Sequence, residues 1–187
     1  AGLVIPRGEI VTLIGANGAG KTTLLNALMG LLPYRGKVTF DQRDLENISV
    51  EERAARGIGL VPETRDLFTS MSVEDNLLAG AYLPRCRADI ATKLDEVYTL
   101  FPRLADRRAQ IVSQMSGGEQ QMVAIGRALM SSPSLILFDE LSLGLAPAVV
   151  DDIYRTVDRI WRQGVTCVII EQDMNRALAA ATQVCVM

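Results

Sequence analysis

A glycine-rich octapeptide, GANGAGKT at residues 15–22, restricts the fold of this chain more than any other stretch of its sequence. It follows a short apolar run, EIVTLIG at 9–15, which is typical of a buried strand, and it leads into residues 21–29, whose apolar residues recur at helical spacing. The pattern G-x-x-x-x-G-K-[ST] between a strand and a helix predicts a loop whose backbone N–H groups surround phosphate oxygens. The competing interpretation is a tight strand-to-helix turn that carries an incidental lysine.

This loop predicts a role for each of its polar side chains. We expect Lys21 to reach the β- and γ-phosphates of a nucleotide and the hydroxyl of Thr22 to bind Mg²⁺. The full set of predicted nucleotide-binding residues is Gly15, Ala16, Asn17, Gly18, Ala19, Gly20, Lys21, Thr22 and Thr23.

Short apolar runs alternate with helical patterns along the rest of the chain. The expected buried strands cover 58–61, 135–138 and 165–170, and KVTF at 37–40 predicts a half-exposed antiparallel strand. The expected helical stretches cover 72–113, 118–130 and 150–164, with a short helix and the start of another strand at the end. This alternation indicates an α/β domain with a largely parallel sheet and a helical insertion on one side. Ligands bind such sheets at the carboxyl ends of the strands, where we expect Gly15, Pro62, Asp139 and Gln172.

The composition excludes several kinds of chemistry. The chain of 187 residues contains no histidine, and its three cysteines, Cys86, Cys167 and Cys185, show no C-x-x-C spacing, so a zinc site is not indicated. Cys167 and Cys185 read as core residues, whereas Cys86, between two arginines, reads as a loop thiol. A net charge of −3 argues against a broad nucleic-acid surface, and no apolar run is long enough to span a bilayer.

An acidic pair follows the apolar run LILF at 135–138. Asp139 stands where a nucleotidase of this loop type holds its Mg²⁺ shell, and Glu140 stands where a second acid would orient or deprotonate an attacking water. The alternative is a pair of acids that cap a following helix.

The stretch QMSGGEQQMVAIGRAL at 114–129 contains a second glycine-rich helix start, with no strand before it. Ser116 is a good N-cap, and exposed N–H groups at Gly117 and Gly118 would favour an anion. A chain with one phosphate loop would then use this second helix start for a nucleotide held by another copy. Helix capping alone explains the stretch equally well.

Together these motifs resemble the nucleotide-binding domains of the ABC-type ATPases. GANGAGKT looks like their Walker A loop, LILFDE like Walker B and MSGGE like their signature. The resemblance implies a P-loop NTPase sheet core with an antiparallel β edge and an inserted helical subdomain. It divides the chain into a RecA-like core, 1–63 and 132–187, and a helical subdomain, 64–131, that includes the signature helix. The stretches VPE, SLGLAP and IIEQDM look most like the ATP-binding subunits of branched-chain amino-acid importers.

The resemblance also implies cofactors, partners and a location. Two such subunits, identical or different, would close around two ATP, each with Mg²⁺. Ser116, Gly117, Gly118 and Glu119 of one copy would then face the γ-phosphate bound by Lys21 of the other. Closure would drive membrane-spanning permease subunits, with a substrate-binding protein as a further partner. The subunit would lie in the cytoplasm at the inner face of the cell membrane, without nucleic acid and without entering the bilayer.

The sequence departs from the family pattern at several positions. Glu63 replaces the usual Gln that links Mg²⁺, water and the membrane partner, and the alternative for Glu63 is a solvated loop acid. A bare charge about 4 Å from the γ-phosphate would cost about 4 kcal/mol at an effective dielectric constant of 20, so Glu63 should face Mg²⁺ or a basic group. Gln172 stands where most relatives have histidine; we expect its amide to donate hydrogen bonds to the γ-phosphate without acid–base chemistry, and the alternative is a helix cap. Leu141 replaces a common Pro, and Glu119 a common Gln.

Other functions remain to be weighed against transport. One is a regulatory nucleotide-binding module with little hydrolysis, which the changes at positions 63 and 172 favour. Another is an ABC-type ATPase that acts on DNA or ribosomes, which the absence of long insertions disfavours. Only 14 residues precede Gly15, none of them an aromatic residue that could stack on adenine, and the chain ends in an expected strand. We therefore expect the sequence to be a piece of a longer domain.

Overall fold

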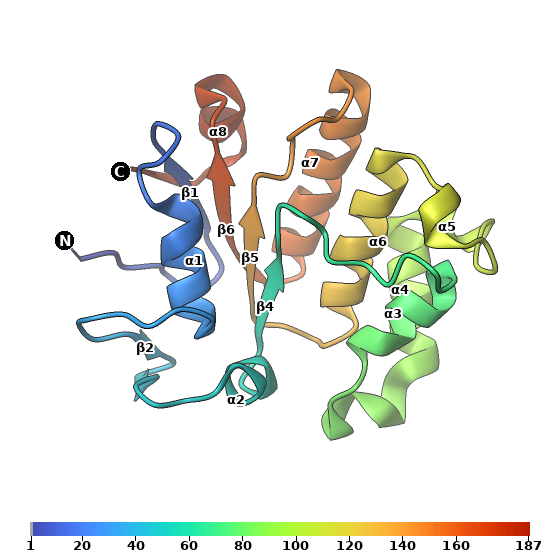
Figure 1. Ribbon diagram of the computed structural model, residues 1–187, viewed down its shortest axis with the longest axis horizontal. Helices are drawn as coiled ribbons and strands as arrows, with labels where there is room; N and C mark the ends of the chain where they lie inside the picture. The colour runs from blue at the N-terminus through green and yellow to red at the C-terminus, as the bar shows by residue number, and fades with distance from the viewer. Residues whose placement is uncertain (1) are drawn as a thin grey trace.

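A computed structural model describes residues 2–187 of the chain. The described residues form a five-stranded parallel sheet with the order β4-β5-β6-β1-β7 (Figure 1). Its strands are β1 (Ile10–Ile14), β4 (Ile58–Val61), β5 (Leu135–Asp139), β6 (Thr166–Glu171) and β7 (Gln183–Val186). A separate antiparallel pair, β2 (Thr39–Phe40) and β3 (Arg43–Asp44), supplies the expected β edge. The predicted fold class is therefore confirmed.

Helices cover both faces of the sheet and form a group beside it (Figure 1). They are α1 (Lys21–Met29), α2 (Val50–Ala55), α3 (Val73–Gly80), α4 (Ile90–Leu100), α5 (Pro102–Ala105), α6 (Gly117–Leu129), α7 (Pro147–Arg162) and α8 (Met174–Ala180). Two short 3₁₀ helices, η1 (Pro84–Asp89) and η2 (Val112–Gln114), lie in the inserted region. That region, α3 to α6, is the helical stretch expected between the second and third core strands, although it is divided into more pieces.

The core has two parts because side chains alternate between the faces of each strand. On β6, Val168 and Ile170 pack with α1, whereas Cys167 and Ile169 pack on the other face with α7 and the helical group. These strands are buried on both faces, which explains why they read as continuous apolar runs. Parallel pairing aligns their carboxyl ends, so that Asp139 lies opposite Ile170.

Arg53 of α2 is a buried cation, with a residue exposure of 2%. Its guanidinium donates hydrogen bonds to the carbonyls of Ala27 and Leu28, at the end of α1, and to those of Leu45 and Ile48. It thereby adds a partner to carbonyl groups in the last turn of α1, where intrahelical hydrogen bonds run out. Arg53 joins the β2–β3 layer to the helix that begins at the phosphate loop.

The cysteines have no special chemistry in this fold. Cys86, which reads as a loop thiol in the sequence, lies in η1 and is completely buried, with its Sγ 3.5 Å from the carbonyl oxygen of Ser131. Cys167 is a core residue as expected, and burial raises the pKa of its thiol to about 12. Cys185 is partly buried against the α1 side of the core.

Candidate functional site

The loop between β1 and α1 has the backbone shape that anion binding needs. Gly18 and Gly20 adopt left-handed conformations, with φ of 84° and 96°, which glycine reaches without strain. Gly20 is the N-cap of α1, no side chain caps the helix, and its first turn has no acidic residue. The positive end of the helix therefore faces the loop without a competing carboxylate from the loop itself.

Lys21 lies inside this loop rather than in solvent. It is 5% exposed, and its Nζ donates to the carbonyl oxygens of Gly15, at 2.8 Å, and Ala16, at 3.1 Å. Residues 16–19 form the exposed rim of the loop, and Thr23 is exposed on α1. The loop thus holds the Lys21 ammonium against two of its own carbonyl oxygens, and the predicted contact of Lys21 with nucleotide phosphates stays a prediction.

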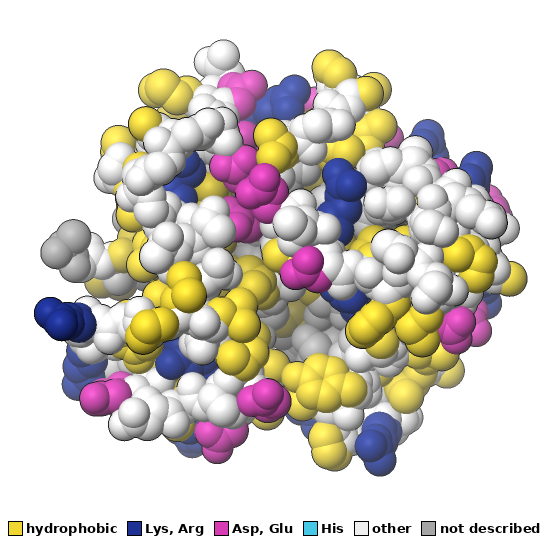
Figure 2. Space-filling view, in the orientation of Figure 1, with side chains coloured by type: hydrophobic (Ala, Val, Ile, Leu, Met, Phe, Trp, Pro, Cys, Tyr) yellow, Lys and Arg dark blue, Asp and Glu magenta, His cyan; other side chains and the backbone are white. Residues whose placement is uncertain are grey.

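Asp139 brings the acidic pair to the foot of the loop. The hydroxyl of Thr22 donates to Asp139 Oδ1 at 3.1 Å, so β5 and the first turn of α1 meet here. Burial raises the pKa of the Asp139 carboxyl; the Thr22 hydrogen bond opposes the shift, and the charges of Glu140 and Glu63 add to it. Figure 2 shows acidic side chains gathered over the ends of β5 and β6.

These groups fit Mg²⁺, which prefers hard oxygen ligands and takes only one or two of them from protein when phosphates supply others. The observation that supports a cation here is the Asp139 carboxyl, whose pKa is raised and which accepts a hydrogen bond from the Thr22 hydroxyl. Among residues 2–187 no group of three or more Cys, Asp or Glu side chains could hold a metal by itself. A metal here would therefore depend on phosphate oxygens as well as on Thr22 and Asp139.

Glu140 has a strained backbone and a single strong side-chain contact. Its φ is 51°, a left-handed value that non-glycine residues adopt at a cost of about 1–3 kcal/mol. The side-chain amide of Gln172, at the end of β6, donates to Glu140 Oε1 at 2.5 Å. The cap of α8 is Asp173, whose Oδ1 accepts from the N–H groups of Asn175 and Arg176. The alternative interpretation of Gln172 as a helix cap is therefore wrong.

Glu63 follows β4 and is exposed. Its charge contributes to the raised pKa of Asp139, which places it within electrostatic reach of the site. Two and three residues further on, Arg65 and Asp66 both have left-handed backbones, with φ of 65° and 45°. Arg127 of α6 donates to both of their carbonyl oxygens, so the signature helix holds the loop that carries Glu63.

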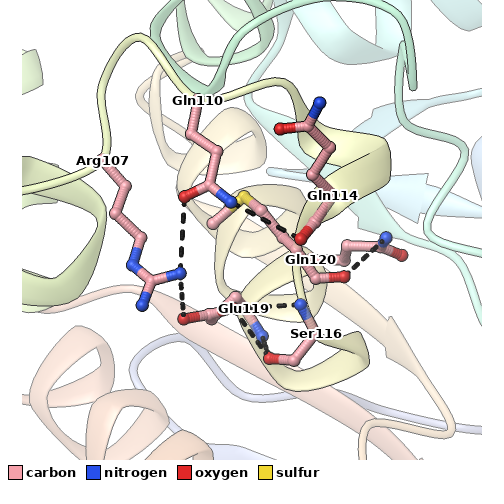
Figure 3. Close-up of polar contacts among 7 residues, drawn as sticks. Arg107, Gln110, Gln114, Ser116, Glu119 and Gln120 are labelled. Carbon is pink, nitrogen blue, oxygen red and sulfur yellow. Dashed lines mark hydrogen bonds and ion pairs between the residues drawn. The ribbon is translucent and has the colours of Figure 1, made fainter.

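The signature residues form a closed capping box at the start of α6 (Figure 3). Glu119 Oε2 accepts from the backbone N–H and the hydroxyl of Ser116, at 3.0 and 2.9 Å, and the N–H of Glu119 donates back to Ser116 Oγ. Arg107 pairs with Glu119 at 3.3 Å. Burial would raise the pKa of Glu119, but the Ser116 hydrogen bonds and the charges of Arg107 and Arg103 outweigh it and lower this pKa. Capping is thus a real role of the motif; a role towards a second nucleotide stays a prediction.

Gly118 has a packing role in addition to any role in binding. It is buried, and a Cβ at this position would lie 2.4 Å from Cγ1 of Val149 on α7. Only glycine permits this approach of α6 to α7. Gly117 lies beside Leu145 and the guanidinium of Arg65.

Sequence reasoning missed one residue of this region, Glu171. It is the last residue of β6 and is 3% exposed. Its carboxylate accepts from the hydroxyls of Ser142 and Tyr154 and from the N–H groups of Gln172 and Asp173. The available signal was its place beside Gln172 at a strand end, but its side-chain partners are distant in sequence.

The comparisons agree with this geometry. A family profile described as ABC transporter matches residues 1–142. The chain is 44% identical over 184 residues to the high-affinity branched-chain amino acid transport ATP-binding protein BraG of Pseudomonas aeruginosa, covering 98% of this chain and 78% of that protein. It is 36% identical over 183 residues to the lipopolysaccharide export system ATP-binding protein LptB of Escherichia coli K12, covering 95% and 74%.

Solved structures give the same result. The chain resembles a nucleotide-free ATP-binding cassette from an ABC transporter with a TM-score of 0.85 and 28% identity, and the ADP conformation of MJ1267, another such cassette, with a TM-score of 0.84 and 29% identity. Each likeness covers 98% of this chain and 78% of the solved one. The fold and the site define a P-loop nucleotide-binding domain of the α/β class. Within that class, the chain belongs to the ABC transporter family, as an ATP-binding cassette.

Proposed function

We propose that this subunit binds and hydrolyses ATP, with Mg²⁺, to power a membrane transporter for branched-chain or other hydrophobic amino acids. The observation that carries the hydrolytic part is the contact between Gln172 and Glu140, one residue from the Asp139–Thr22 bond at the phosphate loop. The ends of β5 and β6 and the first turn of α1 thus bring Glu140, Gln172 and the Asp139–Thr22 pair to one edge of the sheet. The 44% identity with a branched-chain amino acid transport ATP-binding protein supports the choice of substrate class.

The residues divide the reaction among them. The loop N–H groups and Lys21 bind the phosphates, and Thr22 and Asp139 hold Mg²⁺, which when bound neutralises charge on the β- and γ-phosphates. Glu140 takes a proton from water as the water oxygen bonds to the γ-phosphorus and the bond to the bridging oxygen of ADP breaks. Gln172 keeps the Glu140 carboxylate in place by a hydrogen bond. Because an amide does not titrate in this range, Gln172 supplies geometry alone.

The signature helix is assigned to a second subunit's nucleotide. Ser116, Gly117 and Glu119 lie at a helix start, where N–H groups and the helix dipole favour an anion. The Ser116 hydroxyl now donates to Glu119. An incoming γ-phosphate would accept that hydrogen bond from Ser116 instead. The ion pair with Arg107 would still balance the charge of the Glu119 carboxylate.

A permease is the partner proposed for the exposed apolar surface near α3. Four exposed hydrophobic residues lie on α3 and its flanking segments: Phe68, Met71, Leu78 and Tyr82. Figure 2 shows hydrophobic side chains around a hollow between β4 and α3. No helix within residues 2–187 has the length and apolarity to cross a bilayer. The subunit would therefore attach at the inner face of the cell membrane through its partners, which would include a substrate-binding protein.

The decisive experiment is the Glu140→Gln variant, assayed for ATP binding and phosphate release with and without Mg²⁺. A general base contributes roughly 10²- to 10⁴-fold, so turnover should fall by that factor while ATP affinity stays within about twofold. Glu96→Gln, on an exposed part of α4, is the matched control and should behave as wild type. Wild-type turnover in Glu140→Gln would remove the assignment, and Mg²⁺-independent binding without phosphate release in the native chain would favour a regulatory module.

A further inference from the structure

Glu171 is a buried carboxylate that the proposed reaction does not use directly. No lysine or arginine forms an ion pair with it among the described residues, although its side chain is almost wholly removed from water. Burying a charge without a partner is costly unless hydrogen bonds satisfy it. A residue that the fold keeps at such a cost calls for a specific explanation.

Hydrogen bonds from four groups satisfy this carboxylate. Oε2 accepts from the Tyr154 hydroxyl at 2.5 Å, and Oε1 accepts from Ser142 Oγ at 3.0 Å and from the N–H groups of Gln172, at 2.9 Å, and Asp173, at 3.2 Å. All of these are donors, which fits an ionised, acceptor-only carboxylate. Burial, the Glu171 hydrogen bond and its negative charge together raise the pKa of Tyr154, so the tyrosine stays protonated and remains a donor.

These bonds reach the two segments that flank Glu140, its own loop and the end of β6. Ser142 is two residues beyond Glu140 on the same loop, and Gln172 donates its side-chain amide to Glu140. The backbone of Glu140 is in a left-handed conformation, which persists only when the surroundings hold it there. One carboxylate therefore ties down the loop that carries the strained residue and the strand end that contacts its side chain.

We propose that Glu171 is a positioning residue for hydrolysis, which acts through Gln172 and the Ser142 loop to hold Glu140 towards the water. This inference rests on the proposed function. It differs from a merely structural role because the hydrogen bond from the side-chain amide of Gln172 to Glu140 must weaken when Glu171 is changed.

The first test is a double-mutant cycle on phosphate release. Glu171→Gln keeps the shape but places amide hydrogens against groups that are all donors. Its kcat should fall about tenfold, with KM for ATP within about twofold, since the phosphate loop is untouched. In a Gln172→Ala background the further loss should be smaller than in wild type, because only the route through the Ser142 loop then remains and residues that act through one another are not additive. An equal loss in both backgrounds, or a change confined to KM, would overturn the proposal.

A second measurement does not depend on activity. The side-chain amide NMR signals of Gln172, assigned by their loss in Gln172→Ala, should lie away from the free-amide position because of the bond to Glu140. They should move towards that position in Glu171→Gln and stay in Glu96→Gln. If Glu171→Gln does not fold, Tyr154→Phe and Ser142→Ala, which each remove one donor, take its place in both measurements. Signals that do not respond to any of these changes would refute the proposal.

The two failures are distinguishable. If the native chain releases no phosphate with Mg²⁺ and ATP, the proposed function is wrong, whereas the Gln172 signals still report on Glu171. If Glu140→Gln abolishes turnover and Glu171→Gln is as active as wild type, only the role of Glu171 is wrong.

Discussion

The two helices that begin at glycine-rich sequences, α1 and α6, complete their first turns in opposite ways. Helix α1 starts after Gly20 with no side-chain cap, so its N–H groups face the loop around Lys21. Helix α6 starts with a full capping box between Ser116 and Glu119, supported by Arg107. The first helix start is prepared for phosphate within one chain. At the second helix start, Ser116 and Glu119 already satisfy each other. A ligand that binds the Ser116 hydroxyl as an acceptor would replace the hydrogen bond from Ser116 to Glu119.

The largest expected effect is the loss of the α1 site. Lys21→Ala removes the only side-chain cation inside the loop, and a hydrogen bond to a charged group is worth about 1.5–3 kcal/mol. ATP affinity of the isolated subunit, measured by titration calorimetry, should therefore weaken by roughly tenfold to a hundredfold. Lys37→Ala, at an exposed lysine, should have no effect. Unchanged affinity in Lys21→Ala would remove the phosphate loop from nucleotide binding.

A change at α6 should separate stability, turnover and affinity. Ser116→Ala should cost about 1 kcal/mol as a lost N-cap, or roughly 2–4 °C in Tm, and should leave ATP affinity of the isolated subunit unchanged. Ser49→Ala removes the capping serine of the same kind of box on α2 and is the matched control. Turnover of the assembled transporter should fall in Ser116→Ala and not in Ser49→Ala. Equal turnover in the two variants would reduce the signature serine to a cap.

The acids of the two regions should respond oppositely to pH. The pKa of Asp139 is raised in the folded chain, so its contribution to stability is present below the unfolded value of 3.8 and is lost as pH rises through the folded value. The pKa of Glu119 is lowered, so its contribution is present above 4.5 and is lost as pH falls through the folded value. At pH 7 without Mg²⁺ and ATP, Asp139→Asn should therefore raise Tm and Glu119→Gln should lower it.

Thermal unfolding from pH 3 to pH 8 checks the sign of the Tm change in each variant. Mg²⁺ with ATP should stabilise wild type more than Asp139→Asn. If Tm at pH 7 changes in the same direction in Asp139→Asn and Glu119→Gln, the opposite pH dependence expected for the two acids is wrong.

The smallest effect is expected at Glu63, on the loop that α6 holds through Arg127. Its charge is a minor contributor to the pKa of Asp139, so Glu63→Gln should move the Asp139 step in the stability profile slightly towards lower pH. The control is Glu96→Gln. If the Asp139 step in the profile of stability against pH does not move, Glu63 is a solvated loop acid. That is the alternative stated for Glu63 from the sequence.

The sequence predicts the α1 side of this comparison better than the α6 side. Helix α1 and strand β4 begin and end where the glycines and Pro62 indicate, because their signals are local. The contact between Gln172 and Glu140 follows from placing two strand ends side by side in a parallel sheet. The sequence analysis does not predict helix α2, because three of its six residues are charged and they form no apolar stripe; its one signal is the capping box that begins at Ser49.

Tertiary contacts account for the rest. The partners of Glu171 are 29 and 17 residues away, and Gly118 is needed because Val149 approaches it from another helix. The buried state of Cys86 likewise depends on packing against residues around Ser131. No spacing rule reports such contacts, because they form only when separate elements meet.

The hydrogen bonds of Arg53 also couple the opening of two segments of the chain. Its guanidinium completes the last turn of α1 from a position 25 and 26 residues further along the chain, and it binds the segment at Leu45 and Ile48 at the same time. The end of α1 and residues 45–53 are therefore one cooperative opening unit, whose backbone amides should exchange hydrogen with a shared free energy. A surface segment far from the nucleotide thus sets how often the helix behind the phosphate loop frays.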